Sequence, residues 1–553
     1  MSTSPLQLES LYSFEKNRPQ ARWLIQPMGN GAVKEFTFAE AMAEARRLAT
    51  HLKSLGLPPK SNIALFSKNT AWWLISDIAI WMAGHISVPL YPTLTAETIG
   101  QILDHSESRL IIIGKLDGFA AMEPGIPASL PRILTPLAPN TRGEAWDTIQ
   151  KASAPMAESP TRPADDLATI IYTSGTTGVP KGVMHSFGTM CASRALVEDL
   201  HVTSEDRMLS YLPLSHVFER TIVETGSFCM GFQVFFAESL ETFVKDLQRA
   251  RPTLFVSVPR LWLKFQAGVN EKMPPKKLNR LLSIPIISGI VKKKILTGLG
   301  LDQVRFAGSG SAPIPGPVID WYRRLGLDLL EGYGMSENFS YSHMTKPGQM
   351  KVGTVGTPQR GVEHRIGEGG EILVKSPCNT IGYYKQPELT KELFTPDGFV
   401  KTGDQGEIDA SGNLRITGRV KELFKTSKGK YVAPAPIENR LLTHPDLEQA
   451  MVAGANQGQP FALAVLSLKG KNRLTAGEGR QQLEAELKAH IDDINAKLDS
   501  HEQLETLVVV TDEWTAENGL LTPTLKLKRS AIEKKYGGNV ETWYRAKTTV
   551  IWA

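Results

Sequence analysis

The sequence predicts a multidomain α/β protein with two unequal parts. Its 553 residues exceed the roughly 100–200 residues of a usual domain, so several folding units are expected. Over the first two thirds, short apolar runs alternate with longer amphipathic stretches, as in layered subdomains with mostly parallel sheets. After about Gly353, short strands with glycine turns predict a small antiparallel, β-barrel-like subdomain.

Hydrophobic periodicity gives the elements of the first part. Short apolar runs predict buried strands at 62–66, 110–114, 168–173, 233–236, 253–258 and 304–307. Apolar residues at helical spacing predict helices at 39–55, 71–83, 96–105, 242–250 and 315–325. Strands and helices that alternate in this way favour parallel β–α layers.

The pattern changes again towards the C-terminus. The antiparallel subdomain is expected to use short strands at 363–366, 371–375, 406–409 and 414–418. Beyond Lys421 the pattern is mixed, with a helix expected at 481–498 and a strand at 504–511. We therefore expect a large N-terminal part, residues 1–418, and a small α+β domain, residues 419–553.

Composition and charge exclude several classes of protein. Hydrophobic residues make up 41% and charged residues 22%, which fits a globular protein and not a disordered one. The net charge of +5 gives no support for a nucleic-acid-binding protein. The cysteines Cys191, Cys229 and Cys378 are odd in number and widely spaced, so they suggest neither a disulfide framework nor a zinc site.

Neither a signal peptide nor a membrane span is predicted. Residues 1–19 are polar and lack an apolar core. The most hydrophobic stretch, residues 72–92, is interrupted by Asp77, His85 and Pro89, whereas a spanning helix needs about 20 nearly uninterrupted apolar residues. We expect a cytoplasmic protein.

The most informative segment is residues 171–182, which follow an apolar strand. Glycines and hydroxyl residues surround Lys181 there, namely Thr173, Ser174, Gly175, Thr176, Thr177, Gly178 and Gly182. Glycines let backbone amides approach an anion, hydroxyls donate further hydrogen bonds, and the lysine adds charge. The common P-loop has Ser or Thr after its lysine, whereas Gly182 follows here. A plain glycine-rich turn is the alternative, which the order of residues disfavours.

This segment resembles the phosphate-binding signature of the adenylate-forming superfamily. That superfamily includes acyl-CoA synthetases, nonribosomal-peptide adenylation domains and luciferases, which activate a carboxylate with ATP and then transfer the acyl group, usually to a thiol. The resemblance runs from about residue 36 to residue 529 through ordered motifs. It implies that Lys181 and the loop hold the β- and γ-phosphates of ATP.

Residues 308–313 and 331–337 resemble the family's adenine and magnesium motifs. Gly308 and Ser309 would admit the flat base, with Gly332 and Gly334 beside it. The resemblance implies that Tyr333 stacks on adenine, Ser336 contacts the α-phosphate, and Glu337 with Thr173 holds Mg²⁺. A hard cation prefers such carboxylate and hydroxyl oxygens, and it neutralises charge as pyrophosphate leaves.

Residues 400–404 match the motif whose aspartate, here Asp404, accepts hydrogen bonds from both ribose hydroxyls. A turn residue beside Gly403 is the plain alternative. Arg419 would supply a second ribose or phosphate contact.

The next residues resemble the start of a mobile C-terminal domain. Lys421 occupies the hinge position, and Lys425 matches a lysine that touches the nucleotide in some long-chain relatives. Gly429 is the expected coenzyme A contact, although Lys428 replaces the first glycine of the Gly-Gly pair that many members carry there.

Two further residues are predicted to be catalytic. Lys526 aligns with the lysine that stabilises charge while the carboxylate attacks the α-phosphorus, and the alignment favours it over Lys528. His216 belongs to a segment that resembles the opening of the acyl pocket, although a helix-start histidine with a structural hydrogen bond is the alternative. The helix expected at 221–230 would line the pocket with small and apolar residues such as Val223 and Gly226, which suits a hydrocarbon chain.

Residues 251–262, followed by a basic segment at residues 264–294, resemble the long-chain branch of the synthetases. The cations of the basic segment flank the apolar run 281–290, which suits peripheral contact with the inner, anionic face of a membrane. A solvated helix–loop–helix insertion is the plainer interpretation.

The resemblance implies an AMP-forming long-chain fatty-acid–CoA ligase with Mg²⁺ as cofactor and ATP, a fatty acid and coenzyme A as substrates. Three alternatives stay open at this point. The first is a fatty-acyl-AMP ligase that serves a carrier protein. The second is an adenylating ligase for another carboxylic acid, and the third is a non-catalytic lipid- or nucleotide-binding relative.

Overall fold

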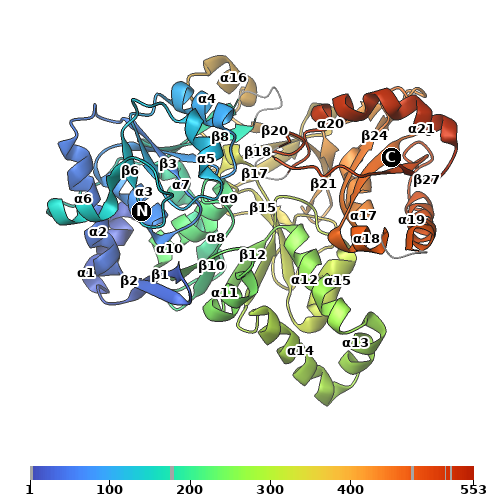
Figure 1. Ribbon diagram of the computed structural model, residues 1–553, viewed down its shortest axis with the longest axis horizontal. Coiled ribbons are helices and arrows are strands. Elements are labelled where there is room, and N and C mark those ends of the chain that lie inside the picture. Colours follow the sequence, from blue (N-terminus) through green and yellow to red (C-terminus); the bar gives the residue numbers. More distant parts are fainter. Residues whose placement is uncertain (1–3, 175–179, 475–478, 517, 523–525) are drawn as a thin grey trace.

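The computed structural model describes residues 4–174, 180–474, 479–516, 518–522 and 526–553. The elements before β22 form a large body on one side, and those from α17 onward gather into a smaller body on the other (Figure 1). The predicted fold class, a layered α/β part followed by a small α+β part, is confirmed.

The largest sheet has the strand order β19-β9-β8-β4-β3-β5-β6-β7. Its strands are β3 (Asn62–Phe66), β4 (Ile86–Leu90), β5 (Leu110–Ile113), β6 (Arg132–Leu134), β7 (Glu144–Ala145), β8 (Leu167–Ser174), β9 (Pro180–Ser186) and β19 (Gly382–Tyr383). Pairing is parallel from β8 through β4 to β7. Strands β9 and β19 add antiparallel neighbours, so Thr173 at the end of β8 lies opposite Lys181 on β9.

Helix α3 (Ala71–Met82) explains the hydrophobic stretch of the sequence. Every residue of this helix is buried, and its core neighbours include α2 (Phe38–Ser54). The stretch is therefore a core helix followed by β4. Among the described residues, no helix is both long enough and apolar enough to cross a bilayer.

Two further sheets complete the α/β layers. One has the order β12-β13-β14-β15-β16, with β12 (Leu254–Ser257), β13 (Phe306–Ser309), β14 (Leu329–Tyr333), β15 (His343–Met344) and β16 (Thr357–Pro358). The other has the order β10-β11-β1-β2, with β10 (Arg207–Ser210), β11 (Gln233–Phe236), β1 (Arg22–Gly29) and β2 (Ala32–Thr37). Strands β12, β13 and β14 are parallel, so their carboxyl ends share one edge.

The predicted antiparallel subdomain is the sheet β17-β18-β20-β21, with β17 (Glu363–Ile366), β18 (Glu371–Lys375), β20 (Val400–Ile408) and β21 (Leu414–Arg419). The chain leaves β21 at Arg419, two residues before Lys421. It then forms the ribbon of β22 (Phe424–Lys425) and β23 (Tyr431–Val432) and enters α17 (Pro434–Leu441).

The C-terminal sheet has the order β24-β25-β26-β27, with β24 (Leu447–Ala453), β25 (Phe461–Leu466), β26 (Leu507–Val510) and β27 (Val550–Trp552). Apolar clusters form its own core, to which α17 and α19 (Gly479–Asn495) contribute.

The remaining α-helices of the described chain are α1 (Gln7–Asn17), α4 (Ala96–Ser106), α5 (Phe119–Met122), α6 (Trp146–Ala152), α7 (Phe187–Ala192), α8 (Arg194–Asp199), α9 (Val217–Glu219), α10 (Gly226–Met230), α11 (Phe243–Ala250), α12 (Pro259–Lys272), α13 (Pro275–Leu282), α14 (Pro285–Leu299), α15 (Gly316–Leu325), α16 (Pro387–Leu393), α18 (Leu468–Leu474), α20 (Arg529–Tyr536) and α21 (Val540–Ala546).

Candidate active site

One large cleft runs between the two bodies and encloses ≈ 3260 Å³. Its walls come from the ends of β8, β13, β14 and β20 on one side, and from α17 and the segment before α20 on the other. Of the residues predicted from the sequence, those that line it are Thr173, Lys181, His216, Gly308, Ser309, Gly332, Tyr333, Gly334, Ser336, Glu337, Asp404, Arg419, Lys421 and Lys526. Residues from distant motifs therefore share one cavity. Gly175, Thr176, Thr177, Gly178 and the side chain of Ser174 lie outside the described residues.

Tyr333, Asp404 and Arg419, which the sequence predicts at the adenine and ribose, form a hydrogen-bonded group in the cleft. The Tyr333 hydroxyl donates to Oδ2 of Asp404 over 2.6 Å, and Nε of Arg419 donates to Oδ1 over 2.8 Å. Burial and the adjacent carboxylate raise the pKa of Tyr333 well above its usual value, so the phenol stays protonated. Both oxygens of Asp404 are thus oriented from within the protein.

Gly334 is required for the backbone to turn beside Tyr333. A Cβ at this position would lie 2.5 Å from the backbone carbon of Ser340, which no side chain could accommodate. The glycine therefore lets the 334–340 segment fold closely on itself, which brings Ser336 and Glu337 to the cleft.

Tyr383 lies between Glu337 and Lys181, two residues that the sequence predicts at the metal and the phosphates. The Tyr383 hydroxyl donates to Oε1 of Glu337 over 2.7 Å, and Nζ of Lys181 lies 5.4 Å from the centre of the Tyr383 ring. Tyr383 comes from β19, which pairs with β9, and nothing in the sequence motifs identified it. The Glu337 carboxylate and the Thr173 hydroxyl are oxygen donors of the kind that Mg²⁺ prefers, so the residues present fit this ion.

His185 ties the phosphate strand to the adenine motif. Its Nε2 lies 2.7 Å from the carbonyl oxygen of Ser336, and its ring contacts Phe339. Burial, as the main cause, lowers the pKa of His185 to about 4, so the imidazole is neutral near pH 7.

Lys526 reaches into the cleft from the smaller body. Its backbone N–H donates to the Thr522 hydroxyl over 3.0 Å, and its carbonyl accepts from Thr522 N–H over 2.8 Å, which fixes the base of its loop. Although the side chain is exposed to the space of the cleft, surrounding protein atoms and then the charge of Arg419 lower its pKa. The charges of Asp404, Glu422 and Glu337 act in the opposite direction and raise the pKa, but by less than burial and Arg419 lower it.

His216 lines the cleft from the large body, close enough to Lys526 for the lysine charge to act on its imidazole. Its Nδ1 accepts the N–H of Phe218 over 3.1 Å at the start of α9, so the structural hydrogen bond considered for this residue is present. Burial, followed by the charge of Lys526, lowers the pKa of His216 to about 4. The residue both caps a helix and lines the cleft.

Part of the cleft lining is apolar, and we call these side chains the apolar arm. They are Leu196, Val197, Leu200, Val202, Phe218, Ile222, Leu254, Val256, Phe306 and Leu330. In the parallel pair of β12 and β13, Leu254 lies beside Phe306. The pair of Val256 and Gly308 follows two residues later, nearer the carboxyl ends of the strands. Since β13 and β14 end at Ser309 and Tyr333, Leu254 and Phe306 lie further from the predicted nucleotide contacts than Val256 does.

Val223 and Gly226, which the sequence predicted in the acyl pocket, do not line the cleft. The continuous helix expected at 221–230 is instead a π-helix (Arg220–Thr225) followed by α10, and the wider turn changes which side chains face the arm. Val223 is fully buried in the core, and Gly226 lies against Phe232 and Val197. Phe218 and Ile222 face the arm in their place.

A buried ionic cluster fixes this π-helix. Arg220, fully buried, donates to Asp77 over 2.5 Å and to Glu224 over 2.6 Å, and its Nη1 reaches the Thr169 hydroxyl over 2.8 Å. Asp77 comes from α3 and Thr169 from β8, whereas Glu224 belongs to the π-helix itself. The sequence alone could reveal only the pair of Arg220 and Glu224, because these two residues are four positions apart on one helix.

Lys425 and Gly429 lie outside the cleft lining. They belong to the β22–β23 ribbon, where Lys425 lies 5.6 Å from the ring of Tyr431 and Gly429 has φ of +78° in the turn. Lys421 lines the cleft at the junction of the two bodies.

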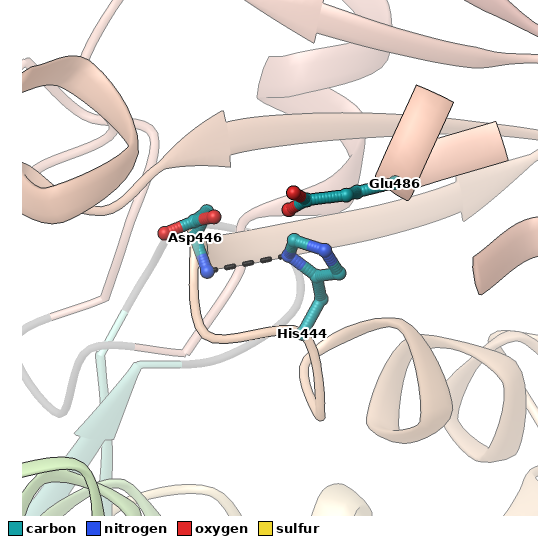
Figure 2. Close-up of side chains that lie close together, drawn as sticks. All are labelled: His444, Asp446 and Glu486. Carbon is teal, nitrogen blue, oxygen red and sulfur yellow. Dashed lines mark hydrogen bonds between the residues drawn. The ribbon is translucent and has the colours of Figure 1, made fainter. Parts of the chain in front are cut away.

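A second group of titratable side chains lies in the C-terminal body (Figure 2). His444, Asp446 and Glu486 point towards one another from the loop before β24 and from α19. Arg473 binds both oxygens of Glu486 over 2.8 and 2.9 Å and also pairs with Asp446, while Nδ1 of His444 accepts the N–H of Asp446. Because Arg473 balances the carboxylates, we interpret this group as a structural ion-pair network.

The cleft brings together the residues expected to hold a nucleotide, from the large body, and the lysine expected to be catalytic, from the small one, which is the arrangement expected of an adenylate-forming enzyme. The chain belongs to the AMP-binding enzyme family, which matches residues 13–384, and the C-terminal domain of AMP-binding enzymes matches residues 422–548.

Relatives with curated names support the same placement. A long-chain-fatty-acid–CoA ligase, FadD15, of Mycobacterium bovis is 32% identical, with 96% of each chain covered. Long-chain-fatty-acid–CoA ligase 5 of Rattus norvegicus is 30% identical over 94% of this chain and 85% of its own.

Solved structures share the fold. The adenylation domain of a carboxylate reductase from Mycobacterium chelonae superposes with a TM-score of 0.83 at 22% identity, covering 98% of this chain and 91% of that one. O-succinylbenzoate coenzyme A synthetase from Bacillus subtilis, solved with AMP, gives 0.73 at 23% identity, covering 96% and 98%.

Proposed function

We propose that this protein is an AMP-forming acyl-CoA synthetase that activates a long-chain fatty acid with ATP and transfers the acyl group to coenzyme A. The observation that carries the proposal is that Lys526, Asp404 and Glu337 share one cleft with a long apolar arm. The first three suit a nucleotide and its phosphates, and the arm suits a hydrocarbon chain. The family and the named relatives support the same activity.

In the first half-reaction, a carboxylate oxygen of the acid attacks the α-phosphorus of ATP. An oxygen–phosphorus bond forms, the bond to the bridging oxygen breaks, and pyrophosphate leaves with the electron pair. We assign to Lys526 the stabilisation of the charge that develops at the α-phosphate. Neutral His216 would lie beside the carboxylate, with the acyl chain extending into the arm past Phe218 and Ile222.

The nucleotide would be held by groups already oriented in the cleft. Asp404, with Arg419 beside it, would accept the ribose hydroxyls, Tyr333 would stack on adenine between Gly308, Ser309 and Gly332, and Ser336 would contact the α-phosphate. The loop after β8 and Lys181 would hold the β- and γ-phosphates. Glu337 and Thr173 would hold Mg²⁺, which when bound neutralises charge on the leaving pyrophosphate. Such catalysis depends mainly on positioning and electrostatics.

In the second half-reaction, the sulfur of coenzyme A attacks the acyl carbonyl carbon. A carbon–sulfur bond forms, the bond to AMP breaks, AMP leaves with the electron pair, and the thiol proton passes to solvent. We propose that residues 419–553 rotate about Lys421 between the two steps. In this structure Lys526 lines the cleft, while Lys425 and Gly429 of the same small body lie outside its lining. Rotation would withdraw Lys526 from the cleft and bring the face that carries Lys425 and Gly429 towards it.

The decisive experiment is ATP-dependent thioester formation with coenzyme A across acids from acetate to oleate. We expect AMP and pyrophosphate as products and the highest kcat/KM with long chains. A carrier-protein ligase would load a holo-carrier protein but not free coenzyme A. A ligase for another acid would prefer that acid in pyrophosphate exchange, and a non-catalytic relative would show no exchange at all.

A further inference from the structure

Helices α13 and α14 form a hairpin that projects from the large body, at the bottom of Figure 1. Its inner side is packed: Leu278 of α13 and Ile295 of α14 are buried in a cluster with Leu325 of α15. Gln248 on α11 donates to the carbonyl of Gly298 over 2.8 Å and anchors the far end of α14. The hairpin is thus a fixed projection whose tip is free of these contacts.

The tip exposes large apolar side chains. Ile286 is 84% exposed and Ile290 is 65% exposed, and Ile284 and Ile287 are 40% and 37% exposed. These four lie within seven residues, whereas the other exposed large hydrophobics of the described chain are spread over its length. Scattered exposed hydrophobics need no explanation, but a cluster at the end of a projection indicates a contact surface.

The segment that contains the hairpin is rich in cations. The segment from 264 to 294 carries Lys264, Lys272, Lys276, Lys277, Arg280, Lys292, Lys293 and Lys294 against one carboxylate, Glu271. The whole chain has a net charge of only +5, so the rest of the protein is slightly acidic. None of these eight side chains forms an ion pair with a described residue, so their charge is available to a partner.

Along the axis of α14, the exposed isoleucines lie nearer the tip of the hairpin than the lysines do. Ile286, Ile290 and Lys293 are exposed on one face of the helix. Lys293 follows Ile286 by seven residues, which is about 10 Å of helix axis at 1.5 Å per residue. A hairpin that meets a bilayer tip first would therefore hold Lys293 about 10 Å further from the bilayer centre than Ile286. With Ile286 among the acyl chains, the Lys293 ammonium would lie at the level of the lipid phosphates.

We propose that the α13–α14 hairpin docks on an anionic lipid bilayer, with Ile286 and Ile290 inserted and Lys292, Lys293 and Lys294 on the phosphates. Charge complementarity favours this occupant over a second copy of the chain, because two such hairpins would repel each other. The cleft continues along α12 to Glu271 and reaches Pro275 at the base of the hairpin. Docking would therefore bring the cleft close to the membrane in which fatty acids dissolve, a benefit that rests on the proposed function.

The test is flotation of the full-length protein with phosphatidylcholine vesicles, with and without phosphatidylglycerol. We expect binding only to the anionic vesicles and loss of binding as salt rises. The triple variant Lys292→Glu, Lys293→Glu and Lys294→Glu should bind at least about tenfold more weakly, because each cation near an anionic surface contributes several-fold. Ile286→Asp should weaken binding about tenfold or more, since a charge replaces an inserted side chain.

Matched controls lie elsewhere on the surface. Leu240 is 89% exposed, so Leu240→Asp controls for Ile286→Asp, and a triple reversal of the exposed Lys53, Lys488 and Lys534 controls for charge. Both controls should bind like the wild type. Equal binding by wild type and hairpin variants, or equal binding to neutral vesicles, would overturn the proposal. So would a dimer in solution that Ile286→Asp dissociates. Because flotation requires no catalysis, loss of docking and failure of the proposed reaction are distinguished.

Discussion

The hydroxyl of Tyr333 donates a 2.6 Å hydrogen bond to Asp404, a residue on a strand of a different sheet. This contact joins β14, which ends at the adenine motif, to β20 of the antiparallel subdomain. With Arg419 on the other oxygen, Asp404 cannot turn away from the cleft without breaking two bonds. The ribose acceptor that we propose is therefore oriented before any nucleotide arrives.

Asp404→Ala should raise KM for ATP by about 10–100-fold, because hydrogen bonds to a charged group contribute about 1.5–3 kcal/mol. Tyr333→Phe removes only the orienting hydroxyl and should raise KM a few-fold. Pyrophosphate exchange at varied ATP measures both. Glu407→Ala is the control, because Glu407 is exposed on the same strand. An unchanged KM for ATP in Asp404→Ala would disprove the ribose assignment.

Lys526→Ala should slow acyl-AMP formation by about 10²–10³-fold, the usual cost of removing a preorganised electrostatic group. Because the pKa of Lys526 is lowered, its ammonium loses its proton at a lower pH than an ordinary lysine. The kcat/KM for adenylation should thus fall as pH rises, before the usual lysine range. Lys526→Arg should move that alkaline limit upward, because guanidinium keeps its proton.

Lys528→Ala is the matched control for the catalytic lysine. Lys528 is also exposed and lies two residues away in the same segment. It should keep both the rate and the pH profile of the wild type. If instead Lys528→Ala loses adenylation and Lys526→Ala keeps it, the two roles must be exchanged.

Local pattern was enough for much of the fold. The strands expected at 62–66, 233–236, 363–366 and 371–375 coincide with β3, β11, β17 and β18, because short buried or alternating runs carry a strong local signal. Thr173, Tyr333, Asp404 and Lys526, which the sequence motifs assign to one site, all line the same cleft.

Features that depend on contacts between distant segments could not be predicted from the local sequence pattern. The π-helix at Arg220–Thr225 follows from the buried pairing of Arg220 with Asp77, a residue 143 positions earlier. That pairing displaced Val223 from the arm, although its apolar side chain suited the predicted role. Tyr383 was missed for a similar reason, since only the pairing of β19 with β9 brings it to Glu337.

His185 should make the protein less stable in acid. Its folded-state pKa, about 4, lies below the ordinary value of 6.5, so protons bind the unfolded chain more tightly. The stabilisation from the neutral ring is complete above pH 6.5 and is lost as pH falls towards 4, by about 3 kcal/mol in total. His216 and His343, with pKa values of about 4 and about 3, act in the same direction.

His185→Gln keeps a donor for the Ser336 carbonyl but cannot titrate. Its melting temperature should therefore fall less steeply than that of the wild type between pH 6.5 and 4.5, whatever its value at pH 7.5. The exposed His201 provides the control variant, His201→Gln, which should follow the wild-type slope. Parallel slopes for all three proteins would show that His185 does not contribute.

The apolar arm should set the preferred chain length. Val256→Phe fills the arm one two-residue step, about 6.6 Å, closer to the nucleotide site than Leu254→Phe does. Both variants should favour shorter acids, and Val256→Phe should shorten the preference by several more methylenes. A panel of saturated acids in the thioester assay measures the shift, with Val244→Phe on the outer face of α11 as the control. Equal shifts in the two arm variants would contradict the direction that we assign to the arm.

Lys421→Pro should separate the two half-reactions. The turn after β21 is closed by the N–H groups of Glu422 and Leu423, which both donate to the carbonyl of Arg419, and Lys421 lies inside it. Proline fixes its own φ and restricts Val420 before it, so it should hinder rotation about this turn while leaving the present orientation accessible. Acyl-AMP formation, which is measured by pyrophosphate release, should stay within about threefold of the wild-type rate. Thioester formation from preformed acyl-AMP should fall by about 10²-fold or more, because one misplaced group can cost that much. Lys421→Ala removes the side chain but not the backbone freedom, and should keep both steps. Equal loss of both half-reactions in Lys421→Pro would mean that the turn is needed for folding or for adenylation and is not a hinge between two catalytic orientations.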